Sequence, residues 1–286
     1  TDNNAEFAFD HTRKKLGINT KLTLLTQNFW TGILLFEYKP PGSWTRRETS
    51  DGSWFEVSDE ARVSFGVESN PRKQFSGGFG AEAMVSPSTE LQAAAAYTYA
   101  TLNPSPALQL TLKTNLERRI GDLRVIDCLS EDGSSCWLRS TSRDYALALQ
   151  DTRSLDLTAR ASLALSTELS LEGYMQVFAA GGGLHDYAAI FAAQGAHPKL
   201  ERASTESIPF NGDSDRDGDR DDRFSFATLN ANMVLRWELF PGTTLIAVYT
   251  RAHRHNRDLN RLAFAGLRRT KAEEIILLKL TLFAGL

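Results

Sequence analysis

AEEIILLKLTLFAGL, residues 272–286, is the stretch of sequence that decides the fold. Apolar side chains occupy every second position, at Ile276, Leu278, Leu280 and Leu282. Lys279 and Thr281 lie between them and point to the opposite side, because successive side chains of a β-strand alternate between its two faces. The stretch therefore predicts a strand that is apolar on one face and polar on the other, with an aromatic residue, Phe283, near its end.

The composition is compatible with both a water-soluble β-protein and a membrane barrel. The 286 residues carry a net charge of -3, 23% of them are charged, and the mean hydropathy is -0.30. There is no run of about 18 apolar residues, which argues against a membrane-spanning helix. A barrel averages to such values because its lipid-facing and lumen-facing side chains alternate. The near-neutral charge provides no basic face, so no nucleic-acid partner is expected.

Period-two alternation recurs along the chain, over 61–68, 75–86, 108–117, 155–166 and 169–177. These runs reach about ten residues, which suits a tilted membrane strand and exceeds the five or six typical of soluble sheets. Turn-forming residues at 27–28, 70–73, 87–89, 103–106, 151–153, 167–168 and 241–242 separate the runs. The pattern predicts one all-β domain over residues 1–286, an antiparallel transmembrane β-barrel with about 12–14 strands in this chain.

The lengths of the connections predict how this barrel sits in a bacterial outer membrane. With the C-terminus in the periplasm, polar segments 40–53, 181–223 and 257–270 fall on the outer side, as outer-membrane barrels prefer. Residues 181–223 are expected to form a long acidic extracellular loop, and residues 1–15 a partial strand or a linker. The scheme places Cys128 and Cys136 on the periplasmic side. A disulfide between them is expected in an oxidising compartment, and two unpaired thiols are the alternative.

Charged side chains between the apolar ones are predicted to line the barrel lumen. They are Glu60, Arg62, Glu82, Lys113, Arg160, Glu172, Arg236, Glu238 and Lys279. Mixed charge favours either a water-filled path or an interior filled by ion pairs. Arg236 and Glu238 would then line a selective pore or pair across the lumen to satisfy buried charge. Trp237, on the opposite face near a strand end, is expected in the aromatic girdle at a membrane interface.

Residues 213–222, DSDRDGDRDD, form the sharpest local motif. Its alternating carboxylates belong to Asp213, Asp215, Asp217, Asp219 and Asp221. With Gly218 at the sixth position they are similar to the start of a calcium loop. The twelfth position is Phe224, so the bidentate glutamate of an EF-hand is missing. The motif predicts weak calcium binding, with a solvated acidic loop as the alternative, and no other cofactor is expected.

His253 and His255 alternate with Arg251, Arg254 and Arg257. Two histidines on one face of a strand suit a metal pair, but no carboxylate or cysteine in the same segment completes the coordination. The segment is predicted instead to form a basic outer rim that contacts lipopolysaccharide phosphates. Outer-membrane lipid and lipopolysaccharide are therefore the expected partners.

Three segments carry a family resemblance: QNFWTG at 27–32, YMQVFAAGG at 174–182 and LNANMVLRWELFPGTTL at 229–245. The third resembles the signature of outer-membrane β-barrels of unassigned function that usually carry an N-terminal carbohydrate-binding module of family nine (DOMON-like). The family's barrels are longer than this chain, and the module has no counterpart in it. The resemblance therefore implies the C-terminal portion of a larger barrel, with any glycan partner bound by the missing module.

The expected function is a channel or conduit of the cell envelope, porin-like and linked to carbohydrate binding or uptake. One alternative is a passive membrane anchor for a glycan-binding surface module, and a second is a surface-associated hydrolase. No pair of carboxylates stands out as a glycosidase acid and nucleophile, and no Gly-x-Ser-x-Gly elbow exists. Catalytic residues are therefore not assigned, and no enzyme activity is expected of this chain.

Overall fold

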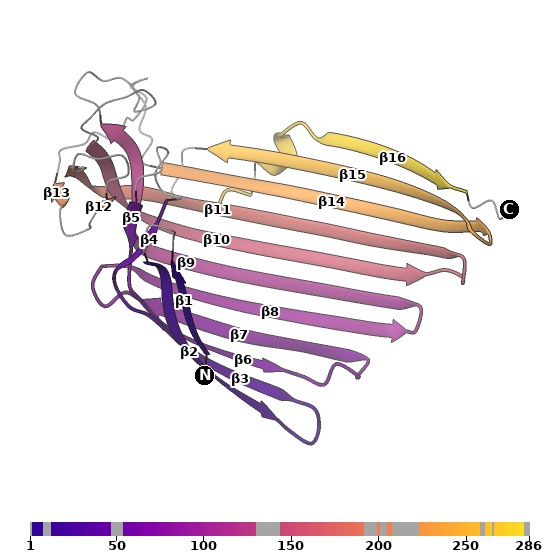
Figure 1. The fold of residues 1–286 in the computed structure, drawn as a ribbon. Coiled ribbons are helices and arrows are strands. Elements are labelled where there is room, and N and C mark those ends of the chain that lie inside the picture. Colours follow the sequence, from indigo (N-terminus) through magenta and orange to yellow (C-terminus); the bar gives the residue numbers. More distant parts are fainter. Residues whose placement is uncertain are drawn as a thin grey trace.

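The computed structural model describes residues 2–7, 13–46, 54–129, 144–191, 199–200, 205–207, 223–257, 261–264 and 266–282. They form a 13-stranded antiparallel sheet and a separate three-stranded sheet (Figure 1). The main sheet contains, in spatial order, β1 (Asp2–Phe7), β2 (Arg13–Leu25), β3 (Thr31–Lys39), β6 (Glu60–Glu68), β7 (Phe75–Val85), β8 (Gln92–Ser105), β9 (Leu108–Leu129), β10 (Asp144–Ala164), β11 (Leu169–Phe191), β14 (Arg223–Phe240), β15 (Thr243–Arg257) and β16 (Glu273–Thr281). In addition, β13 (Thr205–Ser207) pairs with β11. The small sheet contains β12 (Lys199–Leu200), β5 (Trp54–Val57) and β4 (Ser43–Thr45).

The main sheet is an up-and-down meander in which each of these long strands pairs with the next one in the spatial order. It curves into an open wall, with β1 and β16 at its two edges and the two chain ends far apart (Figure 1). The predicted antiparallel β architecture and its strand number are confirmed, and β1 provides the partial strand expected within residues 1–15. The one helical element described is a single 3-10 turn, η2 (Leu267–Arg269). Among the described residues, no helix has the length and apolar content needed to cross a membrane.

The connections between strands lie at two opposite ends of the wall, and the four longest share one end. The connections 26–30, 69–74, 106–107, 165–168 and 241–242 lie at the end where β16 finishes, and we call this the turn end. The strands that flank residues 40–59, 86–91, 130–143, 192–222 and 258–272 end or begin at the other end of the wall, which we call the loop end. The prediction placed the segment from Cys128 to Cys136 at the same end as the C-terminus, and this is an error, because β9 ends at Leu129 and β10 begins at Asp144 at the loop end.

This error has a local cause at residues 151–153, which form part of β10 and not the predicted turn. The pairing of β10 with β9 shifts register between Gln150 and Thr152. Opposite the shift, Gly121 adopts a φ of 68°, and its N–H donates a hydrogen bond of 3.0 Å to the Asp151 carboxylate. Residues typical of turns thus build a β-bulge within two long strands. Because the segment continues as one strand through the bulge, β9 and β10 meet at the loop end and not at the turn end.

The predicted loop 181–223 also needs correction at its start. Strand β11 continues to Phe191, and Gly181, Gly182 and Gly183 pair with β10 on one side and β14 on the other. The glycines allow close packing here, because a Cβ on Gly181 would lie 2.6 Å from the carbonyl oxygen of Arg261. The connection between β11 and β14 therefore begins after Phe191, in residues 192–222.

The register gives the sheet two chemically different faces. Side chains of directly paired residues share a face of the sheet. Every second residue of a strand therefore has the same parity, and the pairs show which parity of the next strand lies on the same face. The face that we call apolar carries large exposed side chains from most strands, among them Leu22, Leu34, Phe65, Phe79, Leu112, Met175, Met233 and Leu278. Soluble proteins rarely expose a continuous apolar surface of this extent. The opposite face, which we call polar, carries most of the charged side chains in the rows of paired residues that run across the strands.

Candidate functional site: the polar face

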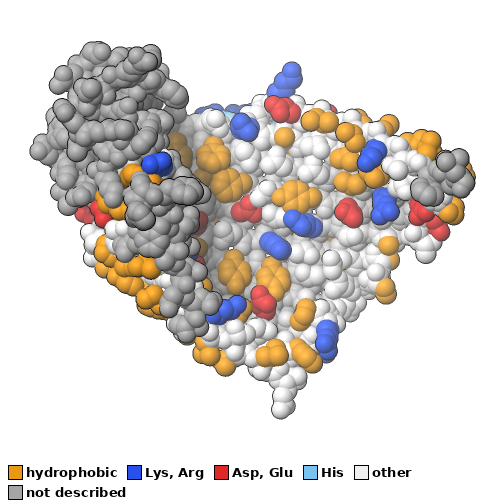
Figure 2. Space-filling view, viewed as in Figure 1, with side chains coloured by type: hydrophobic (Ala, Val, Ile, Leu, Met, Phe, Trp, Pro, Cys, Tyr) orange, Lys and Arg blue, Asp and Glu red, His pale blue; other side chains and the backbone are white. Residues whose placement is uncertain are grey.

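All nine residues predicted to line a lumen lie on the polar face. They are Glu60, Arg62, Glu82, Lys113, Arg160, Glu172, Arg236, Glu238 and Lys279, and the cross-strand pairs place their side chains on the same side of the sheet. Acidic and basic side chains are interspersed across the sheet in the space-filling view (Figure 2). The alternation in sequence thus correctly grouped side chains from seven strands onto one face.

Several charges at the N-terminal part of the polar face are ion-paired. The ammonium of Lys39 lies 2.6 Å from the carboxylate of Glu60, and both side chains are largely shielded from solvent. Arg62 approaches Glu60 at 3.6 Å, Glu82 at 3.3 Å and Glu37 at 3.9 Å. This network across β3, β6 and β7 satisfies its charges internally, as the interpretation of an interior filled by ion pairs predicts.

The charges at the C-terminal part of the same face behave differently. Within the described residues, Lys113, Arg236 and Lys279 form no ion pair. The Glu238 carboxylate accepts a hydrogen bond of 3.3 Å from the backbone N–H of Gly242, and it does not pair with Arg236. These cations therefore have no neutralising side chain among the described residues.

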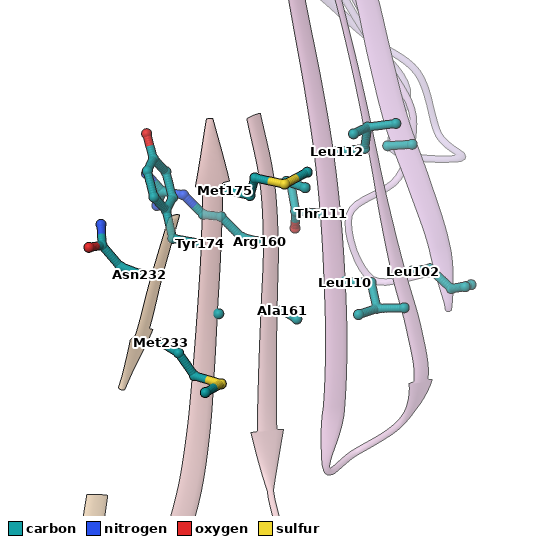
Figure 3. A pocket seen from close by; sticks show the side chains of 13 residues that line it. Leu102, Leu110, Thr111, Leu112, Arg160, Ala161, Tyr174, Met175, Asn232 and Met233 are labelled. Carbon is teal, nitrogen blue, oxygen red and sulfur yellow. The ribbon is translucent and has the colours of Figure 1, made fainter. Parts of the chain in front are cut away.

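A groove crosses β9, β10, β11 and β14 on this part of the polar face. It encloses about 410 Å³, and Lys113, Arg160, Glu172, Tyr174 and Asn232 contribute to its lining. The Arg160 guanidinium lies 5.2 Å from the centre of the Tyr174 ring, and the two side chains extend together beside Asn232 (Figure 3). A cation held against an aromatic ring can still bind an anion or a polar solute from its free edge.

Sequence reasoning did not assign a hydrogen-bonded ladder that adjoins this groove. Tyr174 donates a hydrogen bond of 2.9 Å to Gln176, whose amide contacts the carboxylate of Asp156, and Thr158 donates one of 2.9 Å to the same carboxylate. These four residues lie on the same face of the sheet as Arg160. Their alternation in the sequence could therefore have indicated that they belong to the polar face. The ladder fixes the orientation of the Tyr174 ring in the groove.

Towards the loop end, beyond the pair of Arg153 and Gly181, β11 carries a titratable contact with β10. His185 lies 3.3 Å from the Asp151 carboxylate and 2.8 Å from that of Asp186. Partial burial lowers the pKa of His185, but the hydrogen bonds and negative charges of Asp186 and Asp151 outweigh burial and raise the pKa above its ordinary value. Protonation of His185 is therefore favoured by the folded state.

The predicted basic rim is divided between the two faces of the sheet. Arg254 lies on the polar face, whereas Arg251, His253, His255 and Arg257 lie on the apolar face. Arg251 donates a hydrogen bond of 3.0 Å to Nε2 of His253, and Arg257 donates one of 3.1 Å to Nε2 of His255. These two ring nitrogens therefore already accept hydrogen bonds from arginines. The described residues contain no cluster of three or more potential metal ligands.

Two predicted sites lie outside the described residues. The aspartates of the calcium prediction, Asp213, Asp215, Asp217, Asp219 and Asp221, fall in the connection 208–222. The disulfide prediction involves Cys136, in 130–143, and the side chain of Cys128 is not described either. Both sites remain predictions.

Comparisons with known proteins give fold-level likeness. No family model and no curated protein matches the chain. Its structure is similar to the ferric yersiniabactin uptake receptor FyuA from Yersinia pestis, with a TM-score of 0.48 and 8% identity over 93% of this chain. The chain spans 41% of that receptor. It is also similar to the NanC porin, with a TM-score of 0.27 and 7% identity over 85% of this chain and 92% of that one.

The class of protein follows from the sheet itself. The chain has the antiparallel meander of a β-barrel wall, with apolar and polar side chains sorted onto opposite faces. The link to a carbohydrate-binding module stays a prediction.

Proposed function

We propose that the chain forms the wall of a bacterial outer-membrane β-barrel, with the apolar face towards lipid and the polar face towards a conducting lumen. The sorting of the two faces is the observation that carries this proposal. Leu112 and Lys113 are adjacent in β9, and the leucine is 49% exposed on the apolar face while the lysine lies on the polar one. Exposure of such an apolar surface to water would be unfavourable, whereas contact of this face with lipid accounts for its composition.

The height of the apolar face supports a membrane span. On β10 it extends from Leu163 at the turn end to Leu155, and Arg153 follows as the next residue of the same parity. The ten steps from Leu163 to Arg153 measure about 34 Å along a strand, or about 26 Å across the membrane at a tilt of about 40°. This height is close to the apolar band of about 25 Å on outer-membrane barrels.

Aromatic side chains near the turn end fit the lower boundary of such a band. Trp237 is 45% exposed on the apolar face, and it pairs with Leu169 and Leu245 beside two tight turns. Phe29, Trp30, Phe75 and Phe240 are also exposed at this end. A belt of amphipathic rings is expected at the interface between lipid and periplasm.

A channel or conduit is favoured over a passive anchor by the free cations of the polar face. A barrel that only anchors another module has no need for solvated charge inside, and buried charges without partners would destabilise it. Lys113, Arg236 and Lys279 lack ion pairs in the described part of the chain, so a wet lumen suits them. The anchor for a glycan-binding module remains the second candidate, and it rests on the family resemblance.

Conductance in planar bilayers tests the proposal. The refolded chain, checked for closure by a heat-dependent shift on SDS gels, should give discrete current steps. Replacing Lys113 and Arg236 together by Glu should shift the reversal potential in a salt gradient towards cation selectivity. The matched control replaces Arg72 and Lys73, which lie in the turn-end connection 69–74, and should leave selectivity unchanged. A closed barrel without current would reject the conduit in favour of the anchor.

A further inference from the structure

Two arginines lie directly opposite each other on the apolar face. Arg118 of β9 and Arg153 of β10 form a cross-strand pair, and both side chains are exposed. In the described part of the chain, neither guanidinium has an ion pair or a side-chain hydrogen bond. Like charges in direct opposition destabilise a sheet, since their Cβ atoms are only about 5 Å apart. An anion placed between them would remove this repulsion.

The pair lies at a defined height of the wall. The residues of the same parity towards the turn end are Leu116 and Leu155, so the arginines close the apolar band at its loop-end limit. If the long loops are extracellular, as in outer-membrane barrels, this limit meets the headgroups of the outer leaflet. This step rests on the proposed function.

The pair of arginines belongs to a row of paired residues that continues across the strands towards β15. This row contains small side chains and a further positive charge. Arg153 pairs with Gly181, which pairs with Ser225, which pairs with Arg257. Gly181 lets the backbone of Arg261 lie directly on the sheet beside Arg153, where a Cβ would meet the Arg261 carbonyl oxygen at 2.6 Å. Ser225 is buried, and its hydroxyl has no hydrogen-bond partner among the described residues. The row thus carries arginines on β9, β10 and β15, with the uncharged Gly181 and Ser225 between the last two.

An apolar groove lies on the same face, further towards the turn end, and extends over β8, β9, β10, β11 and β14. It encloses about 520 Å³, with Ala159, Ala161 and Gly173 as its floor and Leu110, Leu112, Met175 and Met233 at its sides. The methionines and leucines lie on the side of the strands away from Tyr174 (Figure 3). Small residues between large ones create the groove. Ala159 is about six residues from Arg153, or about 20 Å along the strand.

We infer that Arg118 and Arg153 bind the phosphate of a glycolipid in the outer leaflet, whose acyl chain lies in the groove below. Guanidinium groups bind phosphate oxygens through short, charge-assisted hydrogen bonds, and two of them can share one phosphate. The apolar groove commits the site to a lipid, because a free phosphate would leave it empty.

Native mass spectrometry of the refolded full chain in detergent tests this inference. The probes are lipid A with its phosphates, lipid A without them, and inorganic phosphate alone. The phosphorylated lipid should bind at least about tenfold more tightly than the dephosphorylated one. R118Q/R153Q should abolish this difference. The conservative variant R118K/R153K should retain part of it, and R72Q/K73Q, with the same loss of charge at the turn end, should retain all of it.

Three results would overturn the inference: equal binding of both lipids by the unmodified chain, an unchanged preference in R118Q/R153Q, or occupation of the site by inorganic phosphate as tightly as by the lipid. The lipid comparison on the unmodified chain decides the first of these even if the double variant does not fold. Conductance of R118Q/R153Q reports separately on the channel, so loss of lipid preference with intact current separates this site from the proposed function.

Discussion

Leu112 gives a decisive test of the two-faced wall, because it lies near the middle of the apolar face and next to a lysine on the polar one. Its side chain is 49% exposed in the structure. In water, exchanging an exposed leucine for lysine would change the free energy of unfolding by no more than about 0.5 kcal/mol. At the midplane of a bilayer the same exchange costs about 2–4 kcal/mol. The variant L112K therefore distinguishes lipid from water by a margin well above experimental error.

The assay is urea unfolding of the chain refolded into liposomes, followed by tryptophan fluorescence and linear extrapolation. The matched control is N115K. Asn115 is exposed on the polar face of the same strand, and it pairs with Asp156 on β10. We expect N115K to lie within about 1 kcal/mol of the unmodified chain. Equal, small effects of L112K and N115K would mean that water covers both faces, and the membrane assignment would have to be abandoned.

Three further predictions concern single positions. The variant G121A should lower the free energy of unfolding by about 1–3 kcal/mol in the same assay. Gly121 has a φ of 68°, and a Cβ at this position would lie 2.8 Å from the Glu90 carbonyl oxygen. An unchanged free energy of unfolding would show that the bulge is dispensable. The variant H185Q should reduce the free energy of unfolding more at pH 5.5 than at pH 8.5. The pKa of His185 is raised in the folded state, so its protonation stabilises the fold fully below the ordinary pKa of histidine, and this stabilisation is lost as the pH rises through the folded-state pKa. Equal losses at both pH values would contradict the contact of His185 with two carboxylates. The variant W237A should cost about 2 kcal/mol in liposomes and W237F much less, whereas equal costs would argue against an interfacial girdle.

Much of the wall was predictable, because the pleat of a strand has a strict period of two. Once Leu278 and Lys279 are placed on opposite faces, every alternating run sorts itself in the same way. For this reason the predicted lumen-lining residues, from Glu60 to Lys279, all lie on one face. Alternation does not reveal a bulge, however, since the turn-like residues around Asp151 lie inside a continuous strand, opposite two residues of β9, Ile120 and Gly121.

The candidate sites depended on information that a single strand does not contain. Arg118 and Arg153 are far apart in sequence, and only the register of β9 against β10 brings them into opposition. The contact of Arg160 with Tyr174 likewise requires the register of β10 against β11. A shift of one residue in either pair would send the side chains to opposite faces.

The sequence by itself determined that this protein is an antiparallel β-protein, which side chains share a face along each strand, and where most of its turns fall, because these properties are local and follow from backbone geometry and turn chemistry. Only the tertiary structure decided which charges are neutralised and which remain free. Arg62 finds carboxylates on β3, β6 and β7, whereas Arg236 finds none among the described residues. Pairing of charges depends on distances between neighbouring strands, and the register of the folded sheet alone fixes these distances.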